Sequence, residues 1–147
     1  RQSKSGRPET IELNGFLGAV VTDYDADKIT FDPVGEVFAK ADPAALERIL
    51  VNVIDNALKF GTHAVVKVNG NPSTVTVADN GPGLTDGDLD RVFNPFEVAS
   101  NARTQSQSGS GLGLTIARML AEAQGARLDL ISEDGGGVSA KLEYADL

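Results

Sequence analysis

The sequence has no cysteine, no tryptophan and a single histidine among its 147 residues. Without cysteine the chain forms neither disulfides nor thiolate metal sites, which suits a cytoplasmic domain. No apolar run approaches the roughly 20 residues that a membrane-spanning helix needs, and no signal-peptide pattern opens the chain. We therefore expect a cytoplasmic domain, and leave open whether a parent protein is anchored in a membrane.

The charge is strongly acidic, with 13 basic and 21 acidic residues and a formal net charge of −8. A chain of this charge repels nucleic acids and anionic membranes at long range, so we expect no nucleic-acid partner. An anionic ligand would need local attraction from a divalent cation, a helix N-terminus or a few basic side chains. The 41% hydrophobic content is ordinary for one globular domain.

The apolar periodicity predicts a mixture of helices and strands. Residues 1–10 are expected to be a tail, and residues 11–147 the folded domain. Helical spacing predicts main helices over about 11–25, 44–60 and 112–123, and a short helix over 86–92. Strands are predicted for "KITFD" and "EVFAKA" around the Asp32-Pro33 turn, for the hairpin "AVVKV" and "TVTVA", and for "ARLDLIS" and "VSAKLEY". The expected fold is α+β, a two-layer α/β sandwich with a mostly antiparallel mixed sheet and three main helices on one face.

Helix 44–60 carries an unusual polar face opposite its apolar stripe. Asn52, Asp55, Asn56 and Lys59 are spaced i, i+3, i+4 and i+7, so they share one face. Asparagine is a poor residue for a helix interior, and an amide oxygen is a suitable ligand for Mg²⁺. Lysine one turn later could contact an anion bound by the same metal. A polar surface without a function is the alternative.

Two glycine-rich segments are candidate ligand sites. In "DNGPGL", Asp79 follows an apolar strand and could accept a hydrogen bond from an amino group, although Asp-Asn-Gly is also a common turn. "GSGLGL", at 109–114, precedes a helix. It matches neither the G-x-x-x-x-G-K-[ST] phosphate loop nor the G-x-G-x-x-G dinucleotide pattern. Taken alone, it could be a flexible hinge.

The order of four motifs resolves these alternatives. "NVIDNALKFG", "DNGPGL", "VFNPF" and "GSGLGL" resemble the N, G1, F and G2 boxes of the catalytic domain of sensor histidine kinases. That domain has the Bergerat fold, shared with the ATPases of gyrase, the heat-shock chaperones and mismatch repair. Gyrase-like members carry a glutamate base four residues before the metal-binding asparagine. Here that position is Asn52, which favours the kinase branch.

The resemblance implies binding of ATP and Mg²⁺. Asn56 would bind the metal, Asn52 would support it, and Lys59 would contact phosphate; these three would serve the transfer reaction. Further nucleotide contacts would come from Phe60, Asp79, Gly81, Gly83, Gly109, Gly111, Leu112 and Gly113. In this scheme Asp79 accepts a hydrogen bond from the adenine amino group. The glycines after it leave room for the base, and the later glycines present backbone N–H groups to the phosphates.

Residues 94–111 would form the ATP lid, anchored by Phe93 and Phe96. Relatives often carry an arginine directly after the F box, where this chain has Glu97 and Val98. Arg103 is therefore the candidate lid cation. The surroundings of His63 do not match a phosphoacceptor motif.

The acceptor histidine is therefore expected on a separate dimerisation domain of the same kinase, with a response regulator downstream. Two alternatives on the same fold are a serine kinase of the anti-sigma-factor type and a non-catalytic nucleotide-sensing module.

Overall fold

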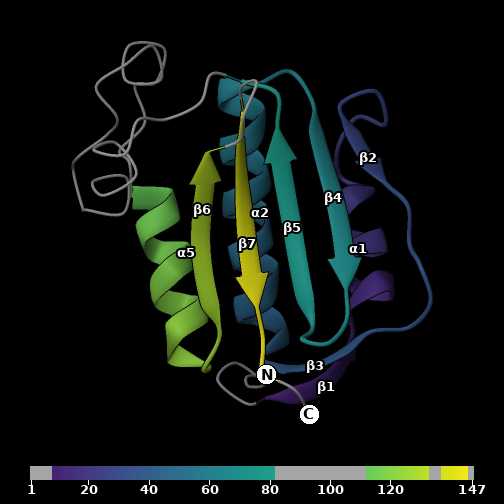
Figure 1. Cartoon of the computed structure of the whole chain (residues 1–147), viewed down its shortest axis with the longest axis vertical. Coiled ribbons are helices and arrows are strands. Elements are labelled where there is room, and N and C mark those ends of the chain that lie inside the picture. The colour runs from purple at the N-terminus through teal and green to yellow at the C-terminus, as the bar shows by residue number, and fades with distance from the viewer. Residues whose placement is uncertain (1–7, 82–111, 133–136, 146–147) are drawn as a thin grey trace.

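The computed structural model describes residues 8–81, 112–132 and 137–145 as two layers, a sheet covered on one face by helices (Figure 1). The five-stranded sheet has the order β2-β4-β5-β7-β6. Its strands are β2 (Ile29–Phe31), β4 (Ala64–Asn69), β5 (Thr74–Asp79), β7 (Val138–Glu143) and β6 (Arg127–Ser132). The helices of the described residues are α1 (Leu13–Val21), α2 (Pro43–Phe60) and α5 (Leu112–Ala123). The predicted α+β sandwich is confirmed.

The sheet is antiparallel except at one edge, where β2 pairs with β4 in parallel. A separate two-stranded ribbon joins β1 (Glu9–Glu12) to β3 (Phe38–Ala41). The two strands predicted around the Asp32-Pro33 turn therefore exist, but they do not pair with each other. The chain leaves β2 and crosses to the far end of the sheet before β3 begins (Figure 1).

Helix α2 forms where the sequence predicts it, because both of its ends are well defined. The Asp42 side chain accepts a hydrogen bond from the Ala44 N–H at 3.2 Å, Pro43 occupies the first turn, and Gly61 follows the last turn. The apolar stripe is almost fully buried, with Leu46, Ile49, Leu50, Val53, Ile54 and Ala57 each at most 4% exposed. It packs against α5 and β5, which orients the polar edge of the helix.

The helix expected over 11–25 is wrong at both ends. Ile11 belongs to β1, and α1 runs only from Leu13 to Val21. Glu12 separates the two elements, because its carboxylate accepts hydrogen bonds from the N–H groups of Asn14 (3.1 Å), Gly15 (2.8 Å) and Val37 (2.9 Å). Glu9 and Thr10, expected in the tail, also lie in β1. When an apolar residue of a strand directly precedes a helix, it can fit the helical spacing and make the predicted helix too long.

The buried stripe of α2 predicts that replacing two different isoleucines by alanine will have very different effects on stability. Ile54 is 0% exposed, whereas Ile131 on β6 is 47% exposed. We expect Ile54→Ala to lower the free energy of unfolding by about 2–5 kcal/mol, because it removes packed methyl groups and leaves a cavity. Ile131→Ala should cost less than about 1 kcal/mol. Urea denaturation measures both, and equal losses would contradict the packing described here.

The position of Glu12 predicts a pH-dependent stability. Burial raises the pKa of Glu12, but the hydrogen bonds from Val37, Gly15 and Asn14 outweigh it and hold the pKa below its ordinary value of 4.5. The stabilisation is therefore complete above about pH 4.5 and is lost as pH falls through the lower folded-state pKa. We expect Glu12→Gln to be less stable than the wild type at pH 7, and this gap to narrow towards pH 3.

Thermal unfolding at pH 7, 5 and 3 measures this gap. Glu9→Gln is the matched control on the same strand, and a surface substitution of this kind should change stability little at each pH. A gap between Glu12→Gln and wild type that stays constant over this range would refute the account.

Candidate functional site

Asn56 and Asp79, predicted from separate motifs, line the same pocket. The pocket lies between the helix layer and the end of β5. Its other walls are Val53, Ala57, Val77, Leu114, Leu130, Val138 and Ala140. The pocket volume is about 10 Å³, room for about one water molecule, so we expect the walls to separate when a larger ligand enters. An amide and a carboxylate therefore face a narrow apolar pocket.

The Asp79 carboxylate is held in a fixed orientation. Its Oδ1 atom accepts hydrogen bonds from the N–H groups of Gly81 (2.9 Å) and Val138 (3.2 Å). The first partner is local, whereas the second belongs to the first residue of β7. Two neighbouring strands thus fix one acceptor group at the mouth of the pocket.

Gly137 makes the contact between Asp79 and β7 possible. Its φ angle is +91°, in a region that side chains disfavour, and a β-carbon there would overlap the carbonyl oxygen of Asp79. Both the backbone angle and the available space therefore require glycine. Nothing in the local pattern of "EDGGG", residues 133–137, distinguishes Gly137 from an ordinary glycine of a turn between strands, so the sequence alone does not predict this requirement.

The polar residues of α2 have different surroundings. Asn52 and Asn56 are half-buried, and Lys59 is exposed in the last turn. Asp55 accepts a hydrogen bond from the Tyr24 hydroxyl at 2.8 Å, so it holds the segment that follows α1. Burial raises the pKa of Tyr24, and the hydrogen bond to Asp55 raises it further. The pocket lining includes Asn56 but not Asn52 or Lys59.

The other predicted residues are placed only in part. Gly81 follows Asp79 at the pocket mouth and donates to its carboxylate. Phe60 ends α2 and Leu112 begins α5, but their side chains are outside the described part of the structure. Gly113 lies in the first turn of α5, next to the pocket residue Leu114. Outside the described residues lie Gly83, Phe93, Phe96, Arg103, Gly109, Gly111, the predicted helix 86–92 and the predicted lid 94–111.

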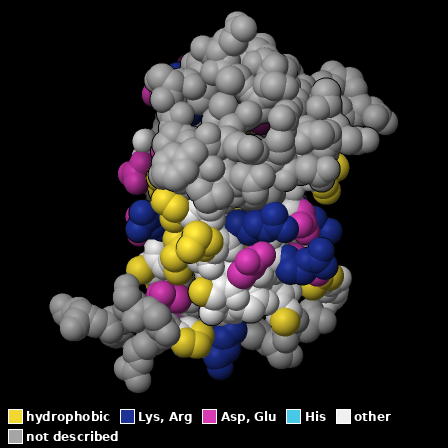
Figure 2. Space-filling model, turned by 90° about the vertical axis from the view of Figure 1, so that its left-hand side faces the viewer, with side chains coloured by type: hydrophobic (Ala, Val, Ile, Leu, Met, Phe, Trp, Pro, Cys, Tyr) yellow, Lys and Arg dark blue, Asp and Glu magenta, His cyan; other side chains and the backbone are white. Residues whose placement is uncertain are grey.

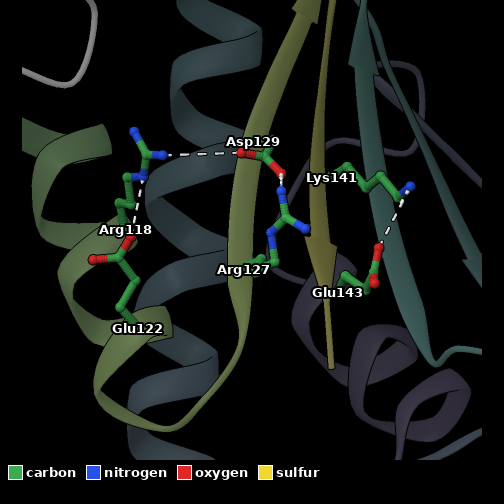
Figure 3. Close-up of polar contacts among 6 residues, drawn as sticks. All are labelled: Arg118, Glu122, Arg127, Asp129, Lys141 and Glu143. Carbon is green, nitrogen blue, oxygen red and sulfur yellow. Dashed lines mark hydrogen bonds and ion pairs between the residues drawn. The ribbon is translucent and has the colours of Figure 1, made fainter. Parts of the chain in front are cut away.

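Helix α5 is fixed against the sheet mainly by burial, since Leu114, Ala117 and Ala121 are at most 5% exposed. Arg118 adds ion pairs with Glu122 at 3.3 Å and with Asp129 of β6 at 3.9 Å (Figure 3). Such exposed pairs each contribute at most about 1 kcal/mol. Packing therefore sets the position of the first turn of α5 beside the pocket.

The α5 side of the molecule has charges of both signs. In the described part of this face, basic, acidic and apolar side chains alternate without forming a large patch of one kind (Figure 2). Arg127 pairs with Asp129 at 3.3 Å, and Lys141 with Glu143 at 3.5 Å (Figure 3). The described part of this face therefore carries no large cluster of charges of one sign.

A second hollow, of about 400 Å³, lies between β4 and the chain that follows β2. It is lined by Thr30, Asp32, Val34, Val37, Val65, Val66, Lys67, Val68, Asn69 and Gly70. None of the candidate nucleotide-binding residues named from the sequence belongs to it. Of the candidate site residues within the described ranges, Asn56 and Asp79 line the smaller pocket, and none lines this hollow.

The donor groups at the pocket suit a lightly coordinated hard cation. Among residues 8–81, 112–132 and 137–145, no group of three or more His, Cys, Asp or Glu could hold a metal ion. Magnesium is often bound by one or two protein oxygens, with phosphate oxygens and waters completing its shell. The half-buried amide of Asn56 fits this role.

None of the described helices is long and apolar enough to cross a membrane.

Comparison with known sequences gives the family. The sequence model of the histidine kinase-, DNA gyrase B- and HSP90-like ATPases matches residues 41–146. The chain belongs to this family. It is 35% identical to the sensor protein KdpD of Mycobacterium tuberculosis over 123 residues, which are 81% of this chain and 14% of KdpD. The chain thus spans about a seventh of the length of this ATPase-family relative.

Solved structures confirm the predicted fold of this ATPase-family domain. The histidine kinase domain of the E. coli osmosensor EnvZ superposes with a TM-score of 0.70 at 27% identity, covering 99% of this chain and 93% of that one. Full-length ShkA, crystallised in complex with AMPPNP, gives a TM-score of 0.76 at 25% identity, covering 96% of this chain and 32% of that one. The resemblance to the ATP-binding domain of sensor histidine kinases is confirmed.

The close approach at Gly137 predicts that adding a single methyl group there will strongly lower the stability of the domain. Gly125 offers a matched control, because its φ is +80° but nothing lies within 4 Å of a β-carbon there. We expect Gly125→Ala to cost about 1–2 kcal/mol from backbone strain alone. Gly137→Ala should cost at least about 2 kcal/mol more, because it also displaces Asp79. Denaturant unfolding of both variants measures the difference, and equal costs would rule out the steric requirement.

Proposed function

We propose that this chain is the ATP-binding catalytic domain of a sensor histidine kinase, which transfers the γ-phosphoryl group of Mg-ATP to a histidine on a separate dimerisation domain. The observation that carries the proposal is the meeting of Asn56 and Asp79 at one pocket beside the first turn of α5. The amide is a suitable metal ligand and the carboxylate a suitable acceptor for a base amino group, so the two side chains could serve different parts of one nucleotide.

Asp79 would bind the adenine amino group. A carboxylate only accepts hydrogen bonds, and two backbone donors already orient this one. The apolar walls around it would cover the faces of the base. Gly81 and Gly83 would let the backbone approach the base, and Phe60 would line the adenine side.

Asn56 would bind Mg²⁺ through its side-chain oxygen, with Asn52 one turn earlier supporting the site. Bound Mg²⁺ would neutralise charge on the phosphate oxygens. Lys59 and Arg103 would contact the phosphates, as would N–H groups near Gly109, Gly111, Leu112 and Gly113 at the start of α5. These local groups would overcome the repulsion expected from a net charge of −8.

In the proposed reaction, a nitrogen lone pair of the acceptor imidazole attacks the γ-phosphorus. The bond from that phosphorus to the bridging oxygen breaks, and ADP leaves. Because the imidazole is itself the nucleophile, the domain needs to position and neutralise the phosphates rather than supply a base. Asn52, in place of the glutamate of gyrase-like ATPases, supports transfer with little hydrolysis.

The names of the relatives support this assignment. KdpD is a sensor protein, EnvZ has a histidine kinase domain, and ShkA was crystallised with AMPPNP. We extend three properties to this chain: Mg-ATP as cosubstrate, a dimerisation domain and a response regulator as partners, and a cytoplasmic location, where ATP is available.

Binding of a non-hydrolysable ATP analogue with Mg²⁺, measured by calorimetry, tests the site. We expect Asn56→Ala and Asp79→Ala each to lower the affinity for the analogue at least about tenfold. This is the effect of losing one or two hydrogen bonds to a charged or metal-bound group. Asn69→Ala, at the second hollow, should bind like the wild type. A wild-type chain that does not bind the analogue would contradict the proposal.

The type of phosphorylated product separates the kinase classes. The chain is incubated with labelled ATP and a candidate acceptor domain, and the product is treated with acid. Label on histidine is lost in acid, whereas label on serine is stable and would instead indicate a serine kinase. Rapid ATP hydrolysis by the chain alone, abolished in Asn52→Ala, would indicate an ATPase.

A further inference from the structure

Asn80, directly after Asp79, makes three hydrogen bonds through its side-chain amide. Its Oδ1 atom accepts hydrogen bonds from the N–H groups of Thr62 (2.8 Å) and His63 (3.1 Å). Its Nδ2 atom donates to Thr62 Oγ1 at 3.0 Å. Thr62 and His63 form the turn that joins α2 to β4. The side chain therefore ties the end of β5 to the end of α2, two elements that are distant in sequence.

Gly61, which has no β-carbon, leaves space for the Asn80 side chain. A β-carbon at Gly61 would lie 2.5 Å from Asn80 Oδ1 and 3.0 Å from the Gly81 nitrogen. The φ angle of Gly61 is −122°, which any residue can adopt, so the backbone angle does not explain the glycine. The lack of space explains it. The segment after β5 therefore lies directly against Gly61, the residue that caps the C-terminus of α2.

His63 holds the same turn from its other side. Its Nδ1 atom lies 3.1 Å from the carbonyl oxygen of Asp27, which can only accept, so Nδ1 carries the proton. In the neutral ring, the Nε2 atom then accepts a hydrogen bond from the Thr30 hydroxyl at 2.6 Å. The turn that binds Asn80 is thus itself fastened to the chain around the start of β2, and gives Asn80 a stable anchor.

We propose that Asn80 is a positioning residue for adenine recognition, acting through Asp79. The proposal rests on the function proposed above, in which Asp79 binds the adenine amino group. Asn80 shares a peptide bond with Asp79 and fixes the strand end relative to α2, which carries Asn56. It therefore sets the spacing between the base-binding carboxylate and the metal-binding amide.

Base selectivity follows from this spacing. Guanine has a carbonyl oxygen where adenine has its amino group, and a carboxylate cannot donate a hydrogen bond to that oxygen. A well-placed Asp79 should therefore favour adenine strongly. An Asp79 that moves on a loosened strand end should favour it less, because its hydrogen bond to adenine is then poorly aligned.

The test compares the whole chain with its Asn80→Ala variant by calorimetry, using non-hydrolysable ATP and GTP analogues with Mg²⁺. We expect the variant to bind the ATP analogue about tenfold more weakly, as for the loss of one well-formed hydrogen bond. Its preference for the ATP analogue over the GTP analogue should fall by a similar factor. Its melting temperature should fall by less than about 5 °C, because the lost bonds lie at the surface.

A pair of glycine variants tests the same point without removing the amide. Gly61→Ala should displace Asn80 and lower both the affinity for the ATP analogue and the preference over GTP. Gly18→Ala is the matched control, because nothing lies within 4 Å of a β-carbon at that position. It should leave both quantities unchanged. This pair gives an answer even if Asn80→Ala does not fold.

The outcomes separate this inference from the proposed function. A wild-type chain that does not bind Mg-ATP defeats the proposed function. If the wild type binds but Asn80→Ala binds equally well, the inference alone is wrong. The inference is also wrong if the wild type does not prefer adenine. Equal weakening of both analogues, with an unchanged preference, would show that Asn80 serves only the general stability of the fold.

Discussion

Burial of one side of α2 is the constraint on which the rest of the structure depends. The stripe from Leu46 to Ala57 is removed from water between the sheet and α5. Once this stripe is buried, the rotation of the helix is fixed, and Asn56 must lie at the pocket beside the end of β5. An asparagine amide is a weak feature on a free helix. On a helix that cannot rotate, the Asn56 amide has a fixed position in the pocket, and the same packing places Asp79, at the end of β5, beside the same pocket.

Much of the fold follows from local sequence patterns. The caps and periodicity predict α2 closely, and the alternating segments predict β4, β5, β6 and β7. The errors arise where a local pattern has two meanings. Ile11 continues the apolar spacing of α1 but belongs to β1. The segments of β2 and β3 look like a hairpin, although each finds its partner elsewhere in the chain.

The sequence points to the chemistry of the candidate site, but not to the contacts that hold its residues in position. Asn56 and Asp79 are recognisable because their residue types are unusual at those positions and because four motifs occur in order. Gly137 and Gly61 are not recognisable in this way, since their requirement comes from backbone contacts with Asp79 and Asn80. Asp55 shares the polar face of Asn56 but bonds to Tyr24 instead. Tertiary contacts of this kind leave no periodic signal in the sequence.

The most direct test of the central claim is a titration of the isotopically labelled chain with a non-hydrolysable ATP analogue and Mg²⁺, followed by amide nuclear magnetic resonance. If the pocket of Asn56 and Asp79 binds the nucleotide, the largest shifts of described residues will occur at Asn56, at 79–81, at 137–138 and in the first turn of α5. Residues around the second hollow, from Asp32 to Val37 and from Lys67 to Gly70, will shift little. Shifts centred on that second hollow, with Asn56 and Asp79 unaffected, would contradict the account.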